Sequence, residues 1–224
     1  MTVPTALEKF ATTIGPKPDE ILLEMNRRAE EIAFPTVGPA VGGWLQQLAA
    51  LVEAERVFEF GSGFGYSAYW FARAVPANGE IVLTEVDEAE LQAARTYLDR
   101  GGYIDRATFE HGDALEIINE YDGPFDIALI DNEKDRYVEA FESVRSKVPV
   151  GGLIVADNAI RGPFEFETLR RLLRGEIDPT RHDTREIESA NGIAAYIDHV
   201  TTQDSFETTL LPLGEGVLIS RRQP

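Results

Sequence analysis

Residues 57 to 65 read Val57-Phe58-Glu59-Phe60-Gly61-Ser62-Gly63-Phe64-Gly65, an apolar run of the β type that ends in three glycines at alternate positions. The helical pattern Tyr66-Ser67-Ala68-Tyr69-Trp70-Phe71-Ala72-Arg73 follows directly. A strand, a glycine turn and a helix in this order bring the backbone of a parallel α/β sheet close to a nucleoside ligand. Glycine is needed where the chain turns sharply and where a side chain would hold the ligand away. This stretch predicts a cofactor site on an α/β sheet.

A second apolar run, residues 81–84, ends at Glu85, twenty residues beyond Gly65. An acid at the tip of the second strand can accept hydrogen bonds from both ribose hydroxyls. The turn lacks the Gly-x-Gly-x-x-Gly spacing that is typical of dinucleotide sites, and its surroundings are negative because of Glu59, Glu85 and Asp87. A cofactor with a cationic sulfonium and an amine suits such a pocket better than a pyrophosphate. We therefore expect S-adenosylmethionine.

Length and composition favour one domain. With 224 residues, of which 43% are hydrophobic, the chain can bury one sizeable core. We expect a single domain, residues 1–224, in which residues 1–52 form a helical cover and residues 53–224 a Rossmann-like core. No apolar stretch is long enough to span a bilayer and no signal-peptide pattern is present, so we expect a soluble, cytoplasmic protein. The absence of cysteine excludes disulfides, thiolate metal sites and cysteine nucleophiles.

The formal net charge of -18 arises from 39 acidic and 21 basic residues, and four of the bases are lysines. This acid excess opposes binding to nucleic acid or to an anionic membrane, because both are negatively charged. An acid-rich, lysine-poor surface resembles those of proteins from a high-salt cytoplasm, where counterions screen like charges. The composition therefore predicts a halophilic protein.

Apolar periodicity divides the chain into alternating elements. Residues 5–34, interrupted at 15–18, and residues 40–52 carry helical patterns ahead of the first strand. Strands are then expected at 56–60, 80–85, 107–111, 125–130 and 152–156. Helices are expected between them at 66–75, 88–101, 114–120 and 134–147. This alternation predicts a parallel, doubly wound sheet.

The pattern changes after Asp157. Helices are expected at 165–174 and 193–200, and two β-type runs follow at 206–211 and 216–220. The intervening residues are too few for a parallel crossover, so the two runs should form a hairpin. The predicted fold is a Rossmann-like, doubly wound α/β sheet of seven strands, mainly parallel, with an antiparallel strand in the C-terminal hairpin and helices ahead of the sheet.

Two further apolar strands end in acids. Residues 125–130 lead into Asp131, and residues 153–156 lead into Asp157 and Asn158. Because the carboxyl ends of strands in an open α/β sheet line the ligand crevice, we expect these three side chains to converge beside the cofactor. Two carboxylates and an amide carbonyl form an oxygen-only set that suits Mg²⁺. The alternative, in which Asp131 caps a helix and Asp157-Asn158 turns the chain, stays open.

Lys134 is a candidate base because it lies one helical turn from Asp131 in a chain that has few lysines. Its amine would then lie beside an acceptor bound at the metal. A lysine held near a divalent cation can take a proton from a hydroxyl that the metal has acidified. A surface ion pair with Glu133 or Asp135 is the alternative interpretation.

The resemblance to a known family rests on a few motifs, chiefly Gly61 to Ser67, Gly112-Asp113-Ala114, Asp131-Asn132-Glu133-Lys134-Asp135-Arg136-Tyr137 and Asp157-Asn158. In combination they closely resemble the cation-dependent O-methyltransferases, class I S-adenosylmethionine-dependent enzymes that include catechol and caffeoyl-coenzyme A O-methyltransferases. The resemblance extends over about residues 37–220. It implies methyl transfer from S-adenosylmethionine to a metal-chelated hydroxyl of a catechol-like small molecule, with Mg²⁺ as the cation and a homodimer as the assembly.

The resemblance also assigns roles to residues. Lys134 is the implied catalytic base, and Asp131, Asp157 and Asn158 are the implied metal ligands. The implied cofactor-binding residues are Glu59, Gly61, Gly63, Gly65, Tyr66, Ser67, Glu85, Val86, Asp113, Ala114 and Asp131. Within that set Glu85 binds the ribose, Asp113-Ala114 lies near the adenine, and Gly61, Tyr66 and Ser67 adjoin the methionine part.

Two features depart from the family pattern. Asn132-Glu133 is unusual between metal ligand and base, and the extra carboxylate could repel acidic substrates or reshape the adenine pocket. Residues 161–185 hold six arginines, which either recognise an anionic substrate or pair with nearby acids on a solvated helix. An NAD(P)-dependent oxidoreductase and a non-catalytic cofactor-binding protein stay open as alternatives. The glycine spacing, the closing hairpin and Lys134 count against the oxidoreductase.

Overall fold

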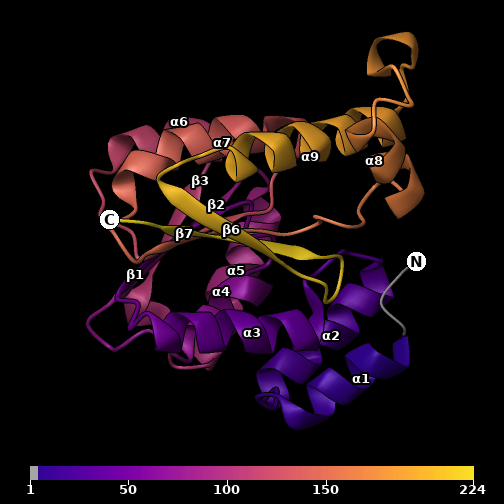
Figure 1. Cartoon of the computed structure of the whole chain (residues 1–224). Coiled ribbons are helices and arrows are strands. Elements are labelled where there is room, and N and C mark those ends of the chain that lie inside the picture. Colours follow the sequence, from indigo (N-terminus) through magenta and orange to yellow (C-terminus); the bar gives the residue numbers. More distant parts are fainter. Residues whose placement is uncertain (1–4) are drawn as a thin grey trace.

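A seven-stranded sheet organises residues 5–224, the part of the chain that the computed structural model describes (Figure 1). Its strands are β1 Arg56–Phe60, β2 Glu80–Glu85, β3 Ala107–His111, β4 Ile127–Ile130, β5 Leu153–Ala156, β6 Phe206–Leu211 and β7 Val217–Arg222. They lie in the order β3-β2-β1-β4-β5-β7-β6, and the first five are parallel. β7 is antiparallel to both β5 and β6. The predicted sheet and its C-terminal hairpin are confirmed.

Helices cover both faces of the sheet, α1 to α5 on one face and α6 to α9 on the other (Figure 1). Their bounds are α1 Thr5–Ile14, α2 Glu20–Ile32, α3 Gly38–Leu51, α4 Tyr66–Ala72, α5 Glu88–Arg100, α6 Ala114–Ile117, α7 Tyr137–Val144, α8 Phe166–Leu173 and α9 Arg185–Thr201. Short 3-10 helices are η1 Ile104–Arg106, η2 Ile118–Glu120, η3 Lys134–Arg136, η4 Arg145–Lys147 and η5 Pro179–Arg181. The predicted helix at 134–147 is thus divided into η3, α7 and η4.

Successive residues of each central strand alternate between two hydrophobic clusters. In β1, Val57 packs in the cluster with α2 to α5, whereas Phe58 and Phe60 pack in the cluster with α6 to α9. Burying a side chain of this size stabilises the fold by about 1.5–3 kcal/mol. Because both faces are covered, such strands read as nearly continuous apolar runs in the sequence. Glu59 interrupts the run, and its side chain is fully buried.

The N-terminal helices bring one loop to the carboxyl edge of the sheet. α3 packs closely on α4, because Gly42 lies so near the Trp70 indole that a Cβ would overlap the ring. The connection between α2 and α3 then passes over the glycine turn, where a Cβ at Gly63 would be 2.8 Å from the Phe34 ring. The N-terminal helices are therefore part of the helical layer that packs on the sheet. Their connection from Phe34 to Val37 lines the cavity.

Two of the element boundaries that differ from the sequence prediction are explained by local hydrogen bonds and packing. β4 begins at Ile127 instead of residue 125, because the Phe125 N–H donates to the Lys147 carbonyl, outside the sheet, at 2.8 Å. The Asp126 carboxylate accepts from the backbone N–H groups of Glu55 and Arg56 at 2.9 Å and ties this corner to β1. α9 begins at Arg185, eight residues before the predicted start. Thr184 caps it by accepting from the Ile187 N–H. The first turns of α9 bury small side chains, which give no apolar signal in the sequence.

Among the described residues, none of the helices combines the length and the apolar character that crossing a membrane requires.

Candidate functional site

A cavity of about 1060 Å³ lies at the carboxyl ends of β1, β2, β4 and β5. Most of the residues that the sequence singled out line it together, as predicted from the parallel topology. They are Gly61, Gly63, Tyr66, Ser67, Glu85, Val86, Asp113, Ala114, Asp131, Lys134, Asp157 and Asn158. Glu59 and Gly65 are the predicted residues that do not line it.

The glycine turn after β1 forms one wall of the cavity. Gly61 has a φ of +82°, and a Cβ there would be 2.9 Å from the Asp131 carbonyl oxygen, so both the backbone angle and the contact require glycine. The Gly63 N–H donates to a Glu85 carboxylate oxygen across 2.8 Å. The turn therefore contacts the end of β4 through Gly61 and the end of β2 through Gly63.

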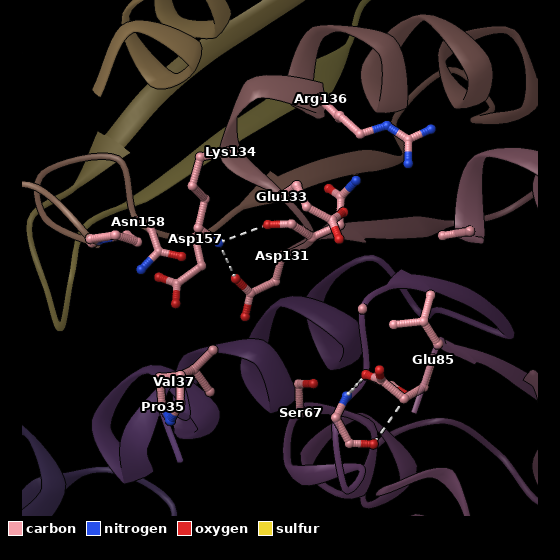
Figure 2. Close-up of a pocket in the computed structure, with 18 of the residues that line it drawn as sticks. Pro35, Val37, Ser67, Glu85, Asp131, Glu133, Lys134, Arg136, Asp157 and Asn158 are labelled. Carbon is pink, nitrogen blue, oxygen red and sulfur yellow. Dashed lines mark hydrogen bonds and ion pairs between the residues drawn. The ribbon is translucent and has the colours of Figure 1, made fainter. Parts of the chain in front are cut away.

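Glu85 is held rigidly at the tip of β2. Its two carboxylate oxygens accept from the backbone N–H groups of Gly63, at 2.8 Å, and Asp87, at 2.9 Å. Each oxygen keeps further acceptor capacity for ligand hydroxyls. Val86 follows and lines the cavity with 64% of its surface exposed. A fixed acid beside exposed apolar surface suits a ribose and an adjoining flat base. Figure 2 shows Glu85 and Ser67 on the same side of the cavity.

An ion pair joins the two loops at the adenine end predicted for the cavity. Arg136 Nη1 lies 2.7 Å from Asp113 Oδ2, while Asp113 Oδ1 accepts from the Leu115 N–H at 2.9 Å and caps α6. The Arg136 hydrogen bond holds the pKa of the Asp113 carboxyl below its usual range. Arg136 belongs to η3, two residues after Lys134, so the pair couples the segment of Lys134 to the start of α6.

The Lys134 amine is fixed by three hydrogen bonds. It donates to Asp131 Oδ1 at 2.8 Å, to the Asn132 carbonyl at 3.0 Å and to the Tyr137 hydroxyl at 2.8 Å. The Lys134 side chain is 12% exposed. Burial, followed by the charges of Asp131 and Asp157, raises the pKa of Tyr137, so the phenol stays neutral. The ion pair is with Asp131, and the alternative surface pair with a neighbouring acid is not formed.

Asp131 and Asp157 lie side by side below Lys134 (Figure 2). The Asp157 side chain is 5% exposed, and its Oδ1 has no hydrogen-bond partner among the described residues. Burial and then the nearby Asp131 charge raise the pKa of Asp157 to about 8. A buried carboxylate oxygen without a partner is costly, and a divalent cation between the two carboxylates would offset that cost.

Asn158 is oriented to supply a third oxygen. Its backbone is left-handed, with φ of +61°, and its Nδ2 donates to Glu215 in the turn between β6 and β7, which leaves the amide carbonyl free to accept. Burial raises the pKa of Glu215. In the described part of the chain, no three His, Cys, Asp or Glu side chains gather as a metal site. The amide is the third oxygen donor of this group, and the donor types fit a hard cation.

Glu59 and Gly65 lie next to the cavity but do not line it. Neither Glu59 carboxylate oxygen has a hydrogen-bond partner among the described residues. Burial raises the pKa of Glu59 to about 8, with the Ser67 hydroxyl opposing and the Asp131 charge adding to the effect. Gly65, with φ of +81°, caps α4, and a Cβ there would be 2.8 Å from the Ala94 Cβ in α5. Gly65 therefore allows close packing of α5 against the turn.

Some residues that shape the site were given no role from the sequence alone. Tyr137 follows Lys134 by three residues at the start of α7, and this spacing was a usable signal. Glu215 gave none, because it reaches Asn158 across 57 positions of sequence. Phe34 and Val37 come from a connection whose path depends on how α3 packs.

The arginine-rich segment is largely a solvated surface. Most of its arginines pair with acids close in sequence, namely Arg170 with Glu167, Arg171 and Arg174 with Glu176, and Arg181 with Asp178. Arg185 lines the cavity, and the charge of Arg161 acts on Glu215. The interpretation as a solvated helix is therefore confirmed for Arg170, Arg171 and Arg174, which lie in α8 or at its C-cap.

Comparison with known proteins identifies the family. The family model described as O-methyltransferase matches residues 17–223. A catechol O-methyltransferase from Niastella koreensis is 37% identical over 149 residues, 64% of this chain and 67% of that protein. A caffeoyl-CoA O-methyltransferase from Petroselinum crispum is 24% identical over 219 residues, 94% of this chain and 87% of that protein. An O-methyltransferase from Bacillus cereus, solved in complex with SAH, superposes with a TM-score of 0.81 at 25% identity and 97% coverage of each chain. The chain belongs to the O-methyltransferase family.

Proposed function

We propose that the protein transfers a methyl group from S-adenosylmethionine to a hydroxyl of a catechol-like small molecule held by a divalent cation, with Mg²⁺ as that cation. Family membership supports the methyl transfer. One observation supports the placement of the cofactor and the acceptor: Glu85, the Asp131–Asp157 pair and Lys134 all line a single cavity. A cofactor bound along the glycine turn would place its methionine end beside Ser67, across from those side chains (Figure 2).

The reaction is an in-line transfer. An acceptor oxygen attacks the methyl carbon, the bond from that carbon to sulfur breaks, and the hydroxyl proton passes to a base, giving a methyl ether and S-adenosylhomocysteine. Holding both reactants in line supplies a large part of the rate. Asp131, Asp157 and Asn158 would hold the divalent cation, which when bound would supply Lewis acidity to the acceptor hydroxyl. Lys134, when neutral, takes the proton at Nζ, and Val37 helps to exclude water from the opposite wall.

The test is turnover of 4-methylcatechol with methyl-labelled S-adenosylmethionine. We expect labelled methyl ether, loss of activity in excess chelator, and recovery with Mg²⁺ or Mn²⁺. Undiminished turnover in excess chelator would remove the metal from the proposal. Tight binding of NAD without binding of S-adenosylmethionine would restore the oxidoreductase alternative. Cofactor binding without turnover of any vicinal dihydroxy compound would indicate a non-catalytic cofactor-binding protein.

For the assembly we propose a homodimer. α1 exposes Leu7, Phe10 and Ile14, each more than half accessible, and this spacing places them on one face of the helix. Apolar side chains exposed together mark association surfaces, and a second copy would cover them. Light scattering on the purified protein should give the dimer mass, and Phe10→Ser should weaken it. A monomer at all concentrations would contradict the proposal.

A further inference from the structure

The cavity holds more negative than positive charge. Eight carboxylates and three cationic side chains line it, and two of the cations are already paired, Lys134 with Asp131 and Arg136 with Asp113. Among the described residues, Arg185 forms no ion pair. A bound divalent cation and the single net positive charge of S-adenosylmethionine would still leave carboxylates in excess. The acceptor therefore enters a negative environment.

Two of these carboxylates lie on the acceptor side of Lys134. Glu188 lines the cavity from the first turns of α9, and one turn later Gly192 of the same helix lies against the Lys134 backbone. Glu215 reaches the cavity from the β6–β7 turn and accepts from Asn158. The acids thus come from two separate elements beside the base and the proposed metal ligands. Arg185 also lines the cavity and the charge of Arg161 acts on Glu215, so these two acids are partly offset, but the cavity as a whole still holds more carboxylates than cations.

The arginine-rich segment does not provide a phosphate site. Recognition of several phosphate charges requires several free arginine or lysine side chains. Four of the six arginines in residues 161–185 are in surface ion pairs with neighbouring acids. Arg161 and Arg185 are left near the cavity, where Glu215 and Glu188 accompany them. The acceptor side therefore lacks the excess positive charge that a coenzyme A moiety needs.

Resting on the proposed function, we propose that the acceptor is a small vicinal dihydroxy compound that carries an amine or no charge. Glu188 is then a specificity-determining residue that disfavours anionic acceptors, including coenzyme A thioesters. The interaction of the Glu188 carboxylate with one charge on a bound acceptor should change kcat/KM by about threefold to tenfold at low salt. Screening reduces this effect as salt is added.

The experiment compares kcat/KM for catechols that differ in charge: dopamine, 4-methylcatechol, 3,4-dihydroxyphenylacetate and caffeoyl-coenzyme A. It is run at the lowest KCl concentration at which the protein is folded, and again at molar KCl. We expect dopamine to be the best acceptor and the two anions the poorest, with the differences shrinking at molar KCl. Glu188→Gln should narrow the ratio of dopamine to 3,4-dihydroxyphenylacetate by about threefold or more.

Asp198→Asn is the matched control, because it removes the same charge from an exposed position of α9 away from the cavity. It should leave the ratio unchanged. Equal kcat/KM for all four compounds, or a preference for caffeoyl-coenzyme A, would overturn the inference and leave the proposed function standing. A preference for 3,4-dihydroxyphenylacetate that Arg185→Gln abolishes would also overturn it. If none of the four is methylated although S-adenosylmethionine binds, the proposed function fails, and this inference fails with it.

Discussion

Gly192 of α9 lies directly against the backbone of Lys134, so closely that a Cβ at position 192 would overlap the Lys134 carbonyl oxygen. The same lysine is held at its other end by Tyr137 and Asp131. Lys134, the proposed base, is thus positioned through both its backbone and its amine. α9, whose first turns line the cavity, rests on the segment that carries Lys134.

Gly192→Ala should therefore lower both the stability and the turnover rate. Overpacking at such a contact costs about 1–3 kcal/mol of stability, and a displaced base should lower kcat by about tenfold or more. Binding of S-adenosylmethionine should change little, because the glycine turn lies elsewhere in the cavity. Thermal unfolding, calorimetric cofactor titration and single-turnover rates measure the three effects. Asn191→Ala, at an exposed neighbouring position, is the control. Wild-type turnover in Gly192→Ala would show that the contact does not position the base.

Lys134→Met should depress turnover by roughly a hundredfold or more, the usual scale for loss of a general base. The residual rate should recover as pH rises, because hydroxide and the ionised acceptor replace the lysine. Lys134→Arg should rescue poorly, since a guanidinium stays protonated and cannot accept the proton. Single-turnover rates across a pH series, with cofactor affinity measured separately, provide the check. Wild-type rates in Lys134→Met at every pH would remove the lysine from the mechanism.

Asp157→Ala should abolish metal-dependent turnover while it keeps much of the affinity for S-adenosylmethionine. The cofactor contacts predicted at Glu85 and the glycine turn come from other strands. The same variant should lose the increase in melting temperature that Mn²⁺ gives the wild type, because ligands that bind the native state stabilise it. Differential scanning calorimetry with and without Mn²⁺ measures this loss independently of activity. An unchanged Mn²⁺ effect in the variant would place the cation elsewhere.

Glu59 should make the protein less stable as pH rises. Burial raises the Glu59 pKa from 4.5 to about 8, so the folded chain keeps a proton that the unfolded chain releases. The free energy of unfolding then falls with rising pH between about 4.5 and 8. Glu59→Gln removes this slope and should be more stable than the wild type by about 2–4 kcal/mol at pH 8. Urea unfolding at pH 5 and pH 8 tests it, with exposed Glu116→Gln as the control. Parallel pH profiles for wild type and Glu59→Gln would contradict the prediction.

Salt should stabilise the folded chain. The 39 acidic residues outnumber the 21 basic ones, so the excess negative charges repel one another. At molar KCl the Debye length is about 3 Å, and the repulsion between charges farther apart than this is largely screened. The melting temperature should therefore rise across a KCl series from dilute buffer to molar salt. A melting temperature that falls steadily with added salt would count against the halophilic interpretation.

The central part of the fold was predictable because strands buried on both faces leave unbroken apolar runs, as in β1 and β4. The site residues at the strand ends followed from the topology, which places Asp131 and Asp157 at the same edge. The early start of α9 was not predictable from periodicity, because its first turns pack through small side chains. The contact between Asn158 and Glu215 was not predictable either, because it depends on tertiary packing between distant segments.

The reversed direction of β7 has a consequence for how the chain is made. The turn before β7 lies beside the cavity, whereas the chain ends on the opposite side of the sheet (Figure 1). Its Glu215 and Gly216 carbonyls accept hydrogen bonds from the backbone N–H groups of Ile160 and Ala159, both at 2.8 Å, and follow the glycine turn by about 150 residues. During synthesis, the glycine turn and its neighbouring strands leave the ribosome long before these anchors exist. A growing chain therefore acquires the residues of the glycine turn well before those that hold the loop of Asp157 and Asn158 in place.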